Sequence, residues 1–274
     1  MFVAIICLVS ALSLAVTSAF TFWKVVNWYD FYRPIIMFIA GYLLGVAIAW
    51  IFYDICGRIM SSYKKKYDKP SNFARFLLAN GMYFIWHHGR ARVKRVGLEK
   101  IPNEPFLLVS NHKSNFDPMI TSSIIGKRHI AFITKRDNMK IPLAGHLMWR
   151  NCYMPVDRED KLQSLEQFKR ATDLIASGAT SVGIYPEGTR QKPDVVLGEF
   201  HNGAFNIAIR TGCPIAIITV RGTEGIHKKF PFRDTKITVK CVQVLYKEDY
   251  ASMNATDLSN YIHDIMLNDL QSAQ

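Results

Sequence analysis

The sequence lacks several patterns that would assign it to common functional classes. Its five cysteines are scattered, odd in number and without Cys-x-x-Cys spacing, which argues against a disulfide framework or a zinc site and favours a reducing compartment. No Gly-x-Ser-x-Gly motif is present, which counts against a serine nucleophile presented on a strand-to-helix turn. Internal repeats and low-complexity tracts are also missing, and the 49% hydrophobic content argues against disorder.

Charge is missing from two long segments near the N-terminus. Residues 1–23 and 34–53 contain no charged side chain. At about 1.5 Å per residue, a helix over either segment comes close to the roughly 30 Å hydrocarbon core of a bilayer. These segments predict a membrane hairpin over residues 1–57, which either spans the bilayer or lies in its interface. A cleavable signal peptide is the alternative for the first segment, although the basic region that precedes such peptides is missing.

Basic residues outnumber acidic ones, and the excess follows the second apolar segment. Residues 54–100 hold 11 Lys or Arg against three acids, whereas the whole chain carries a formal net charge of +12. The positive-inside rule places everything from residue 54 onward on the cytoplasmic side. Contact with anionic headgroups, on the order of 1 kcal/mol per basic residue, is favoured over nucleic-acid binding. Residues 58–92 are predicted to form a basic juxtamembrane region with an interfacial helix at 72–89, for which a core helix is the alternative.

From residue 93 onward, short apolar runs alternate with amphipathic segments. Strands are predicted at 93–97, 106–110, 129–134, 181–185, 214–220 and 236–246, and helices at 160–177, 200–211 and 256–270. The alternation predicts an α/β domain over residues 93–274, with a largely parallel (mixed) sheet flanked by helices and preceded by the hairpin and the interfacial helix. Such folds bind ligands beyond the carboxyl ends of their strands, so polar residues there are candidates for a site.

One predicted strand runs into a polar turn in the segment 106-FLLVSNHKSNFDPM-119. On a continuous helix, His112 and Asp117 would point about 140° apart. If the strand ends near Ser110 and Asp117 caps a following helix, with Pro118 at its first position, the turn can fold the imidazole back onto the carboxylate. The carboxylate would then fix the tautomer and leave the other ring nitrogen as a base. The alternative is a helix cap beside an unrelated loop histidine.

Cations follow other predicted strand ends. Arg190 lies in the polar turn 183-GIYPEGTRQ-191, and its guanidinium can donate two parallel hydrogen bonds to a phosphate. Lys135 follows the third predicted strand, and Arg158 lies in the segment 154–160. Three cations around one base predict an anionic substrate, whereas a surface turn with an ion pair is the alternative for the turn taken alone.

Two of these segments resemble motifs of a known family. NHKSNFD at 111–117 and YPEGTR at 185–190 resemble motifs I and III of the glycerophospholipid acyltransferases, specifically the lysophosphatidic acid (1-acyl-sn-glycerol-3-phosphate) acyltransferases. The lysine-bearing strand end, the end of motif II and the segment that ends in motif IV have counterparts at 133–148, 156–158 and 200–220. The resemblance covers residues 95–225, with His201 standing where the family often has lysine.

The resemblance implies transfer of a fatty acyl group from acyl-CoA or acyl carrier protein to the sn-2 hydroxyl of lysophosphatidic acid, giving phosphatidic acid. His112 would take the hydroxyl proton and Asp117 would orient the imidazole. The expected phosphate-binding group consists of Arg190, Lys135, Arg158, Glu187 and Gly188. Asn111 is expected to stabilise the oxyanion or support the site. No metal is expected, because the pair has no third ligand at a recognisable spacing, and no cofactor is expected either.

The expected partners are a lipid bilayer with anionic lipids, lysophosphatidic acid, and acyl-CoA or acyl carrier protein, without nucleic acid. The expected location is a membrane, with the catalytic domain on its cytoplasmic side. An acyltransferase for glycerol 3-phosphate or another lysophospholipid is the nearest alternative. A serine or cysteine hydrolase and a non-enzymatic, membrane-anchored lipid-binding protein are more distant ones. Residues 226–256 indicate no function from sequence.

Overall fold

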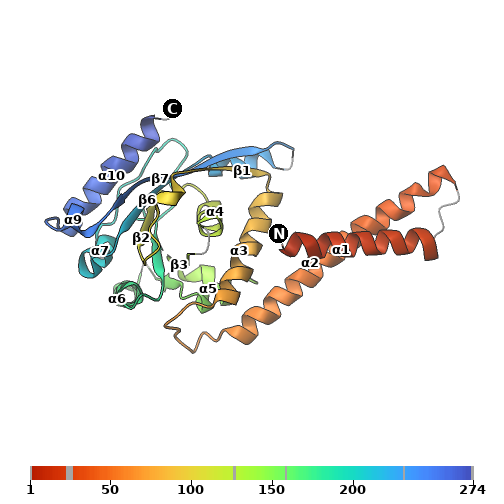
Figure 1. Ribbon diagram of the computed structural model, residues 1–274, viewed down its shortest axis with the longest axis horizontal. Helices are drawn as coiled ribbons and strands as arrows, with labels where there is room; N and C mark the ends of the chain where they lie inside the picture. Colours follow the sequence, from red (N-terminus) through yellow and green to blue (C-terminus); the bar gives the residue numbers. More distant parts are fainter. Residues whose placement is uncertain (1, 23–26, 126–127, 158, 231, 273–274) are drawn as a thin grey trace.

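The protein consists of an α/β domain from which a helical hairpin projects, as the computed structural model shows (Figure 1). The structure describes residues 2–22, 27–125, 128–157, 159–230 and 232–272 of the 274-residue chain. A mixed sheet flanked by helices, with two apolar helices before it, confirms the predicted fold class.

Two apolar helices, α1 (Phe2–Thr17) and α2 (Tyr32–Met60), form the hairpin. Both are long and apolar enough to cross a membrane, by length and composition. Their backbones approach closely because small residues lie between them: a Cβ at Gly41 would lie 2.6 Å from the Ser10 carbonyl oxygen, and one at Gly45 would lie 2.7 Å from a Cys7 backbone carbon.

Helix α2 runs to Met60, past the domain boundary expected at residue 57. The charged residues that end the apolar run do not stop the helix, because Arg58 Nε donates to Asp54 Oδ2 at 2.6 Å, one turn away. Two short helical segments, a π-helix at Ser18–Phe22 and a 3-10 helix at Trp28–Phe31, lie between α1 and α2 in the chain.

Seven strands form the sheet in the order β1-β7-β6-β2-β5-β3-β4. They are β1 (Ala91–Val96), β2 (Leu107–Ser110), β3 (Ile130–Lys135), β4 (Met154–Val156), β5 (Ser181–Ile184), β6 (Ile215–Arg221) and β7 (Thr235–Leu245). Only the β6–β7 pair is antiparallel. Consequently, the carboxyl ends of β2, β3, β4, β5 and β6 lie along one edge of the sheet.

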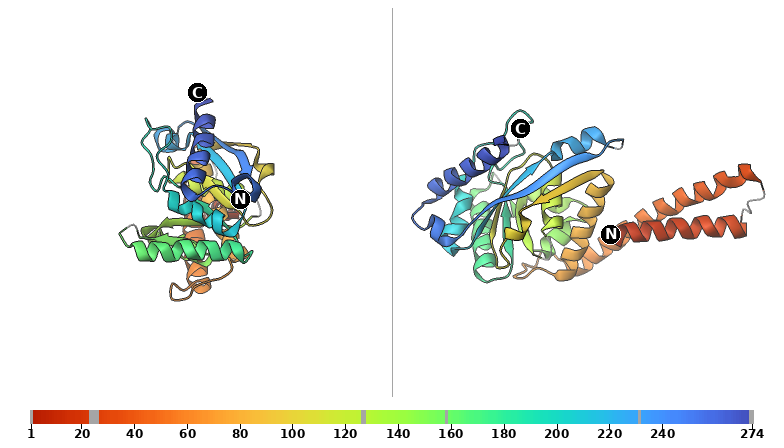
Figure 2. Two further views of the ribbon diagram at one scale, coloured as in Figure 1. Left: turned by 90° about the vertical axis from the view of Figure 1, so that its left-hand side faces the viewer. Right: turned by 45° about the horizontal axis from the view of Figure 1, so that its top comes forward.

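Helices cover both faces of the sheet (Figures 1 and 2). On one side lie α3 (Asn72–His88), α4 (Phe116–Ile124) and α5 (Gly145–Arg150), and on the other lie α6 (Lys161–Ala176), α7 (Asn206–Thr211) and α10 (Ala255–Ser272). Two single-turn helices, α8 (Ile226–Lys229) and α9 (Lys247–Tyr250), flank β7 in the chain. The predicted helix at 200–211 is in fact a 3-10 turn, Asn202–Phe205, followed by α7.

Helix α3 joins the hairpin to the domain. One face of α3 is buried, and on it Trp86 Nε1 donates to Ser123 Oγ of α4 at 3.0 Å. The other face leaves Phe73 and Phe76 49% and 43% exposed, and the Phe76 ring lies 5.9 Å from that of Phe2 in α1. Helix α3 therefore belongs to the core on one face, as in the core-helix alternative, and presents aromatic side chains on the other.

Candidate active site

The candidate site lies at the carboxyl edge of the sheet, where the chain leaves β2, β5 and β6. Strand β2 is completely buried, and its last residue, Ser110, lies two positions before His112. Strand pairing on both sides fixes the position of β2, because Leu108 pairs with Gly183 of β5 and with Ala216 of β6. The segments after these three strands therefore meet around His112.

His112 and Asp117 form the predicted hydrogen bond. The Nδ1 atom of His112 lies 3.0 Å from Asp117 Oδ2, with the imidazole 18% exposed and the carboxylate fully buried. The same oxygen accepts the backbone N–H groups of Lys113 and Ser114, both at 2.7 Å. Nδ1–H therefore donates to the acid, and no residue that the structure describes hydrogen-bonds to Nε2, the atom left to accept a proton.

The helix after this turn begins earlier than expected. Helix α4 starts at Phe116 with Asn115 as N-cap, so Asp117 is the second helical residue and the prediction that it is the N-cap was wrong. The physical reason is that the carboxylate accepts N–H groups from the turn before the helix rather than from the first helical residues. Asp117 thus organises the turn that carries His112.

Thr223 contacts the other oxygen of the acid, and sequence reasoning missed it. Its hydroxyl donates to Asp117 Oδ1 at 2.5 Å, and its side chain is fully buried. Gly222, with a φ of 84°, turns the chain sharply as it leaves β6. The available signal was position, because Thr223 follows the predicted strand 214–220 at the edge where ligands bind.

Glu187 braces the backbone of the site instead of facing it. Its side chain is 3% exposed, and its two oxygens accept the N–H groups of His112, at 2.6 Å, and Gly198, at 2.9 Å. Burial raises the pKa of this carboxyl, and the two N–H donors partly offset that effect. A buried carboxylate with both oxygens engaged cannot bind a phosphate, so its place in the expected phosphate-binding group is corrected to a supporting one.

The turn after β5 also packs against the imidazole. The ring of Tyr185 lies 4.5 Å from that of His112 between centroids. Gly188 has a φ of 65°, and a Cβ there would lie 2.7 Å from the His201 ring. Only glycine adopts this conformation at low cost and leaves room for His201.

Asn111 forms two hydrogen bonds with the backbone of β6. Its side-chain amide donates to the Val220 carbonyl at 2.9 Å and accepts from the Val220 N–H at 2.8 Å. Both polar atoms are therefore used, and the residue is 1% exposed. These bonds extend the β2–β6 pairing by one residue, which favours the support alternative over the oxyanion one.

Two of the three cations predicted near the site, Arg190 and Lys135, lie in the part of the chain that the structure describes. Arg190 is exposed, and the next residue, Gln191, donates its N–H to the His112 carbonyl at 2.9 Å, so this turn runs beside His112. Within the described ranges, no acid forms an ion pair with Arg190. Lys135 ends β3, two strands from β2, and its Nζ lies 2.7 Å from Asp137 Oδ2. Arg158 lies outside the described residues.

Comparisons with known proteins agree with this arrangement. The family model described as acyltransferase matches residues 92–221. This range includes Asn111, His112, Asp117 and Glu187 but not Thr223. A chloroplastic 1-acyl-sn-glycerol-3-phosphate acyltransferase of Brassica napus is 40% identical over 132 residues, which are 47% of this chain and 37% of the relative. The chain is thus similar to the acyltransferases over this segment. The resemblance drawn from the motifs is confirmed.

Other acyltransferases are similar to more of the chain. A 1-acyl-sn-glycerol-3-phosphate acyltransferase of Chlamydomonas reinhardtii is 28% identical over 82% of this chain and 66% of its own length. The match to the first two chloroplastic relatives spans little more than a third of their length. The crystal structure of a 1-acyl-sn-glycerophosphate acyltransferase from Thermotoga maritima superposes with a TM-score of 0.57 at 20% identity, over 83% of this chain and 95% of that one, so the fold is shared.

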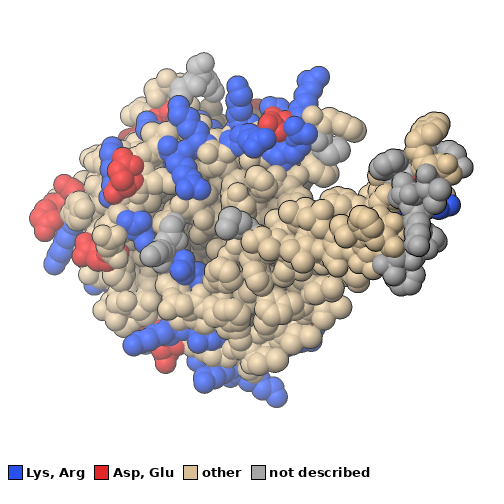
Figure 3. Space-filling view, turned by 45° about the vertical axis from the view of Figure 1, so that its right-hand side comes forward, with Lys and Arg blue, Asp and Glu red and all other residues tan. Residues whose placement is uncertain are grey.

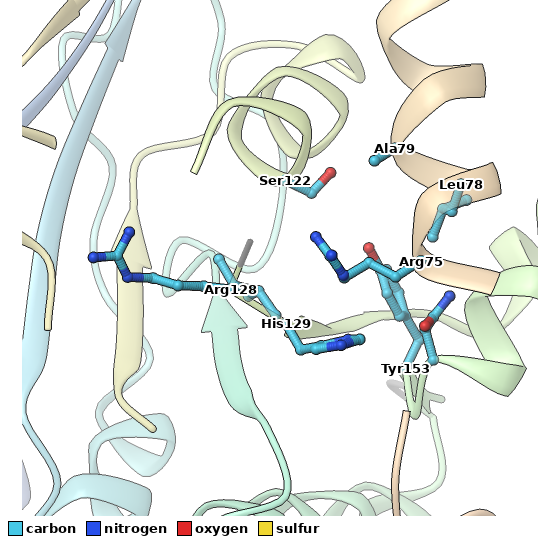
Figure 4. Close-up of a pocket in the computed structure, with 9 residues that line it drawn as sticks. Arg75, Leu78, Ala79, Ser122, Arg128, His129 and Tyr153 are labelled. Carbon is cyan, nitrogen blue, oxygen red and sulfur yellow. The ribbon is translucent and has the colours of Figure 1, made fainter. Parts of the chain in front are cut away.

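A small pocket with a mostly apolar lining lies near the start of β3, at the opposite end of the strands from His112. Figure 4 shows its lining residues. His129 precedes β3 there, and burial followed by the nearby Arg75 lowers its pKa to about 4. The guanidinium of Arg128 points away from the pocket and donates to the carbonyls of Ile101 and Pro102. Asn151, whose buried Oδ1 has no hydrogen-bond partner among the described residues, also lines the pocket, whereas His112 and Asp117 do not.

Metal-binding and thiol chemistry find little support in the described part of the chain. No group of three or more His, Cys, Asp or Glu residues could hold a metal ion there. All five cysteines are free, and burial raises the pKa of Cys152 to about 11. Burial also raises the pKa of Cys213. A thiol with a raised pKa is a poor nucleophile at neutral pH.

Proposed function

We propose that this protein transfers a fatty acyl group from a thioester to the sn-2 hydroxyl of lysophosphatidic acid, giving phosphatidic acid. One observation carries the proposal: a buried carboxylate holds His112 through Nδ1 at a sheet edge and leaves Nε2 as the proton acceptor. The names of the curated relatives support this acceptor.

The reaction would begin with proton transfer from the acceptor hydroxyl to His112 Nε2 as the oxygen attacks the thioester carbon. The tetrahedral intermediate then collapses, the carbon–sulfur bond breaks, and the imidazolium returns its proton to the departing thiolate. Asp117 stabilises the imidazolium throughout. Base catalysis of this kind typically contributes about 10² to 10⁴ in rate.

Direct transfer is favoured over a covalent acyl-enzyme. The acceptor brings its own hydroxyl, so the chain needs a base rather than a nucleophile. Neither Cys152 nor Cys213 is activated, since burial raises the pKa of both thiols. These observations count against the hydrolase alternative.

Arg190 would bind the acceptor phosphate, because it is exposed on the turn that runs beside His112. A bidentate guanidinium–phosphate contact would orient the glycerol so that the sn-2 hydroxyl faces Nε2. Lys135 and Arg158 remain proposed contributors, with Lys135 two strands away from β2.

The hairpin would hold the domain at a membrane, with the catalytic domain on the cytoplasmic side. A lysophospholipid keeps its tail in the bilayer, so a site at headgroup depth can react without extracting it. The donor, acyl-CoA or acyl carrier protein, is anionic, and a chain with a pI near 9.5 attracts either one.

The test compares His112→Ala with His263→Ala in reconstituted membranes. His263 lies on α10 against Phe200, remote from the pair in the chain, and serves as the matched control. Labelled lysophosphatidic acid is supplied with acyl-CoA or acyl carrier protein, and glycerol 3-phosphate and other lysophospholipids replace it in parallel. We expect His112→Ala to lose transfer while His263→Ala retains it. Full transfer by a folded His112→Ala protein contradicts the mechanism, and preference for another acceptor contradicts the substrate.

A further inference from the structure

The segment between α8 and β7 presents aromatic side chains to solvent. Phe230 is 54% exposed and Phe232 is 86% exposed. No other large apolar side chain in the described part of the chain is as exposed as Phe232. Isolated exposed apolar side chains are common, whereas an exposed apolar patch marks a protein or membrane contact surface.

Backbone hydrogen bonds tie the described residues of this segment to α8. The N–H of Phe230 donates to the Ile226 carbonyl at 3.1 Å, and the N–H groups of Phe232 and Arg233 donate to the Lys229 carbonyl at 3.1 and 2.9 Å. Ile226 is 2% exposed and anchors the turn in the core. The backbone therefore holds the phenylalanines outward.

Basic side chains surround the two phenylalanines. Lys228, Lys229 and Arg233 are all exposed, and none forms an ion pair with a described acid. The neighbouring acid, Asp234, is already paired with Arg90 and Arg92, at 2.8 and 2.9 Å, and these bonds lower its pKa. The turn therefore carries a local excess of positive charge next to its aromatic side chains.

The turn lies on the side of the domain from which the hairpin projects (Figures 1 and 2). Ile226 packs against Gly89 at the end of α3, where a Cβ would lie 3.3 Å from its side chain. The preceding residue, His88, is hydrogen-bonded through Nε2 to the Tyr42 hydroxyl of α2 at 2.8 Å. Lys and Arg side chains gather on the domain surface beside the hairpin (Figure 3).

We propose that this turn, consisting of Lys228, Lys229, Phe230, Phe232 and Arg233, is a second membrane contact that binds an anionic bilayer. The phenylalanines enter the headgroup region, and the three cations bind lipid phosphates. Aromatic side chains alone would fit many partners, but the adjoining positive charge and the position on the side of the hairpin select a lipid surface. The inference rests on the proposed membrane association and not on the acyl transfer.

The contact has a consequence for the site. The ring of His227, next to the turn, lies 5.0 Å from that of Phe116, which immediately precedes Asp117. Thr223, at the other end of the same segment, donates to Asp117 itself. Two anchors, the hairpin and the turn, would thus hold the His112–Asp117 pair at a fixed depth relative to the headgroups.

The test measures the lipid exposure of single labels on the full chain. Cys56, which alone among the five cysteines is not buried, is replaced by Cys56→Ala. An environment-sensitive fluorophore is attached after Phe232→Cys, after Leu162→Cys on α6 as the domain control, or after Leu43→Cys on α2 as the hairpin control. Leu162 and Leu43 are 80% and 63% exposed, so none of the three changes disturbs the core. Vesicles contain zwitterionic lipid with or without anionic lipid, and carry a quencher at headgroup level in one set and in the acyl chains in a parallel set, so that both shallow and deep labels are reported.

We expect the label at 232 to be quenched at least about twofold more than the label at 162, with a blue shift that increases with anionic lipid and declines with salt. Lys228→Gln with Lys229→Gln should weaken the dependence on anionic lipid. If the label at 232 behaves like the one at 162 while the label at 43 is quenched, the turn is not a membrane contact. If neither 43 nor 232 is quenched, the proposed membrane association fails as well. Acyl transfer is measured separately, so its failure is distinguishable from both.

Discussion

The carboxylate of Asp117 can be changed so that its charge is lost while its shape is kept. In Asp117→Asn, one oxygen is replaced by an NH2 group. Oδ2 accepts three donors, from His112, Lys113 and Ser114, whereas Oδ1 accepts one donor among the described residues, the Thr223 hydroxyl. The asparagine should therefore turn its oxygen toward the three donors and its NH2 toward Thr223, whose hydroxyl can rotate to accept.

The expected costs differ for stability and for activity. Each hydrogen bond to Asp117 loses its charge assistance, so we expect the free energy of unfolding to fall by about 1–3 kcal/mol. The His112 tautomer is retained in this orientation, but the imidazolium formed during transfer loses its counter-charge. We expect the turnover number to fall by about 10² to 10⁴, or roughly 2.7–5.4 kcal/mol at 1.36 kcal/mol per decade.

Thr223→Val is the matched control. It removes one donor and leaves the charge of Asp117 in place, with one buried oxygen unpaired. We expect a similar loss of stability, about 1–3 kcal/mol, and a fall in turnover of only about tenfold. If Asp117 merely braced the turn, the two variants would lose activity in parallel with stability.

The assay follows thiol release from acyl-CoA with saturating lysophosphatidic acid in reconstituted membranes, normalised to the folded fraction from thermal unfolding. The proposed role of Asp117 requires Asp117→Asn to lose far more turnover than Thr223→Val at comparable stability. An Asp117→Asn protein with wild-type turnover per folded molecule would refute the reasoning.

Three further predictions concern other residues. Arg190→Ala should raise the KM for lysophosphatidic acid by about tenfold or more, with partial rescue by Arg190→Lys; an unchanged KM in steady-state kinetics would exclude a phosphate contact. Gly188→Ala should lower the free energy of unfolding by at least about 1 kcal/mol in thermal melts, because Gly188 has a left-handed φ and an added Cβ would clash with His201. His201→Ala in the same protein should remove the clash but not the backbone strain. A Gly188→Ala protein as stable as the wild type would contradict the geometry. In the unfolded state His129 takes up a proton below about pH 6.5, whereas in the folded state it does so only near its pKa of about 4, so the free energy of unfolding should fall as the pH drops from about 6.5 to about 4. His129→Gln should reduce this pH dependence in thermal melts recorded at a series of pH values. An identical pH profile for the variant would show that His129 does not titrate as described.

The sheet was predictable where its strands are buried. Strands β2 and β5 are buried at every position, so each reads as an unbroken apolar run bounded by polar turns. Strand β4 escaped prediction because it has only three residues and contains Pro155, which removes a backbone donor. Its short pairing with β3 depends on tertiary contacts that no local pattern records.

The site was predictable only where its residues are close in sequence. His112 and Asp117 are five residues apart, so a turn can join them and the spacing alone suggests the contact. Thr223 is 106 residues from Asp117, and the partner of Asn111 is 109 residues away. These contacts follow from the register between β2 and β6, which a single sequence does not contain.

The sheet, more than the turn itself, determines where the imidazole lies. The chain just before the turn is fixed to β6 by Asn111, the backbone of His112 to the β5 turn by Glu187, and the acid to the segment after β6 by Thr223. These braces are buried, whereas Arg190 is exposed on the turn that runs beside His112. Substitutions of the braces should therefore lower turnover by misplacing the base, and substitutions at the rim should weaken acceptor binding, because a fixed base needs a substrate that is brought to it.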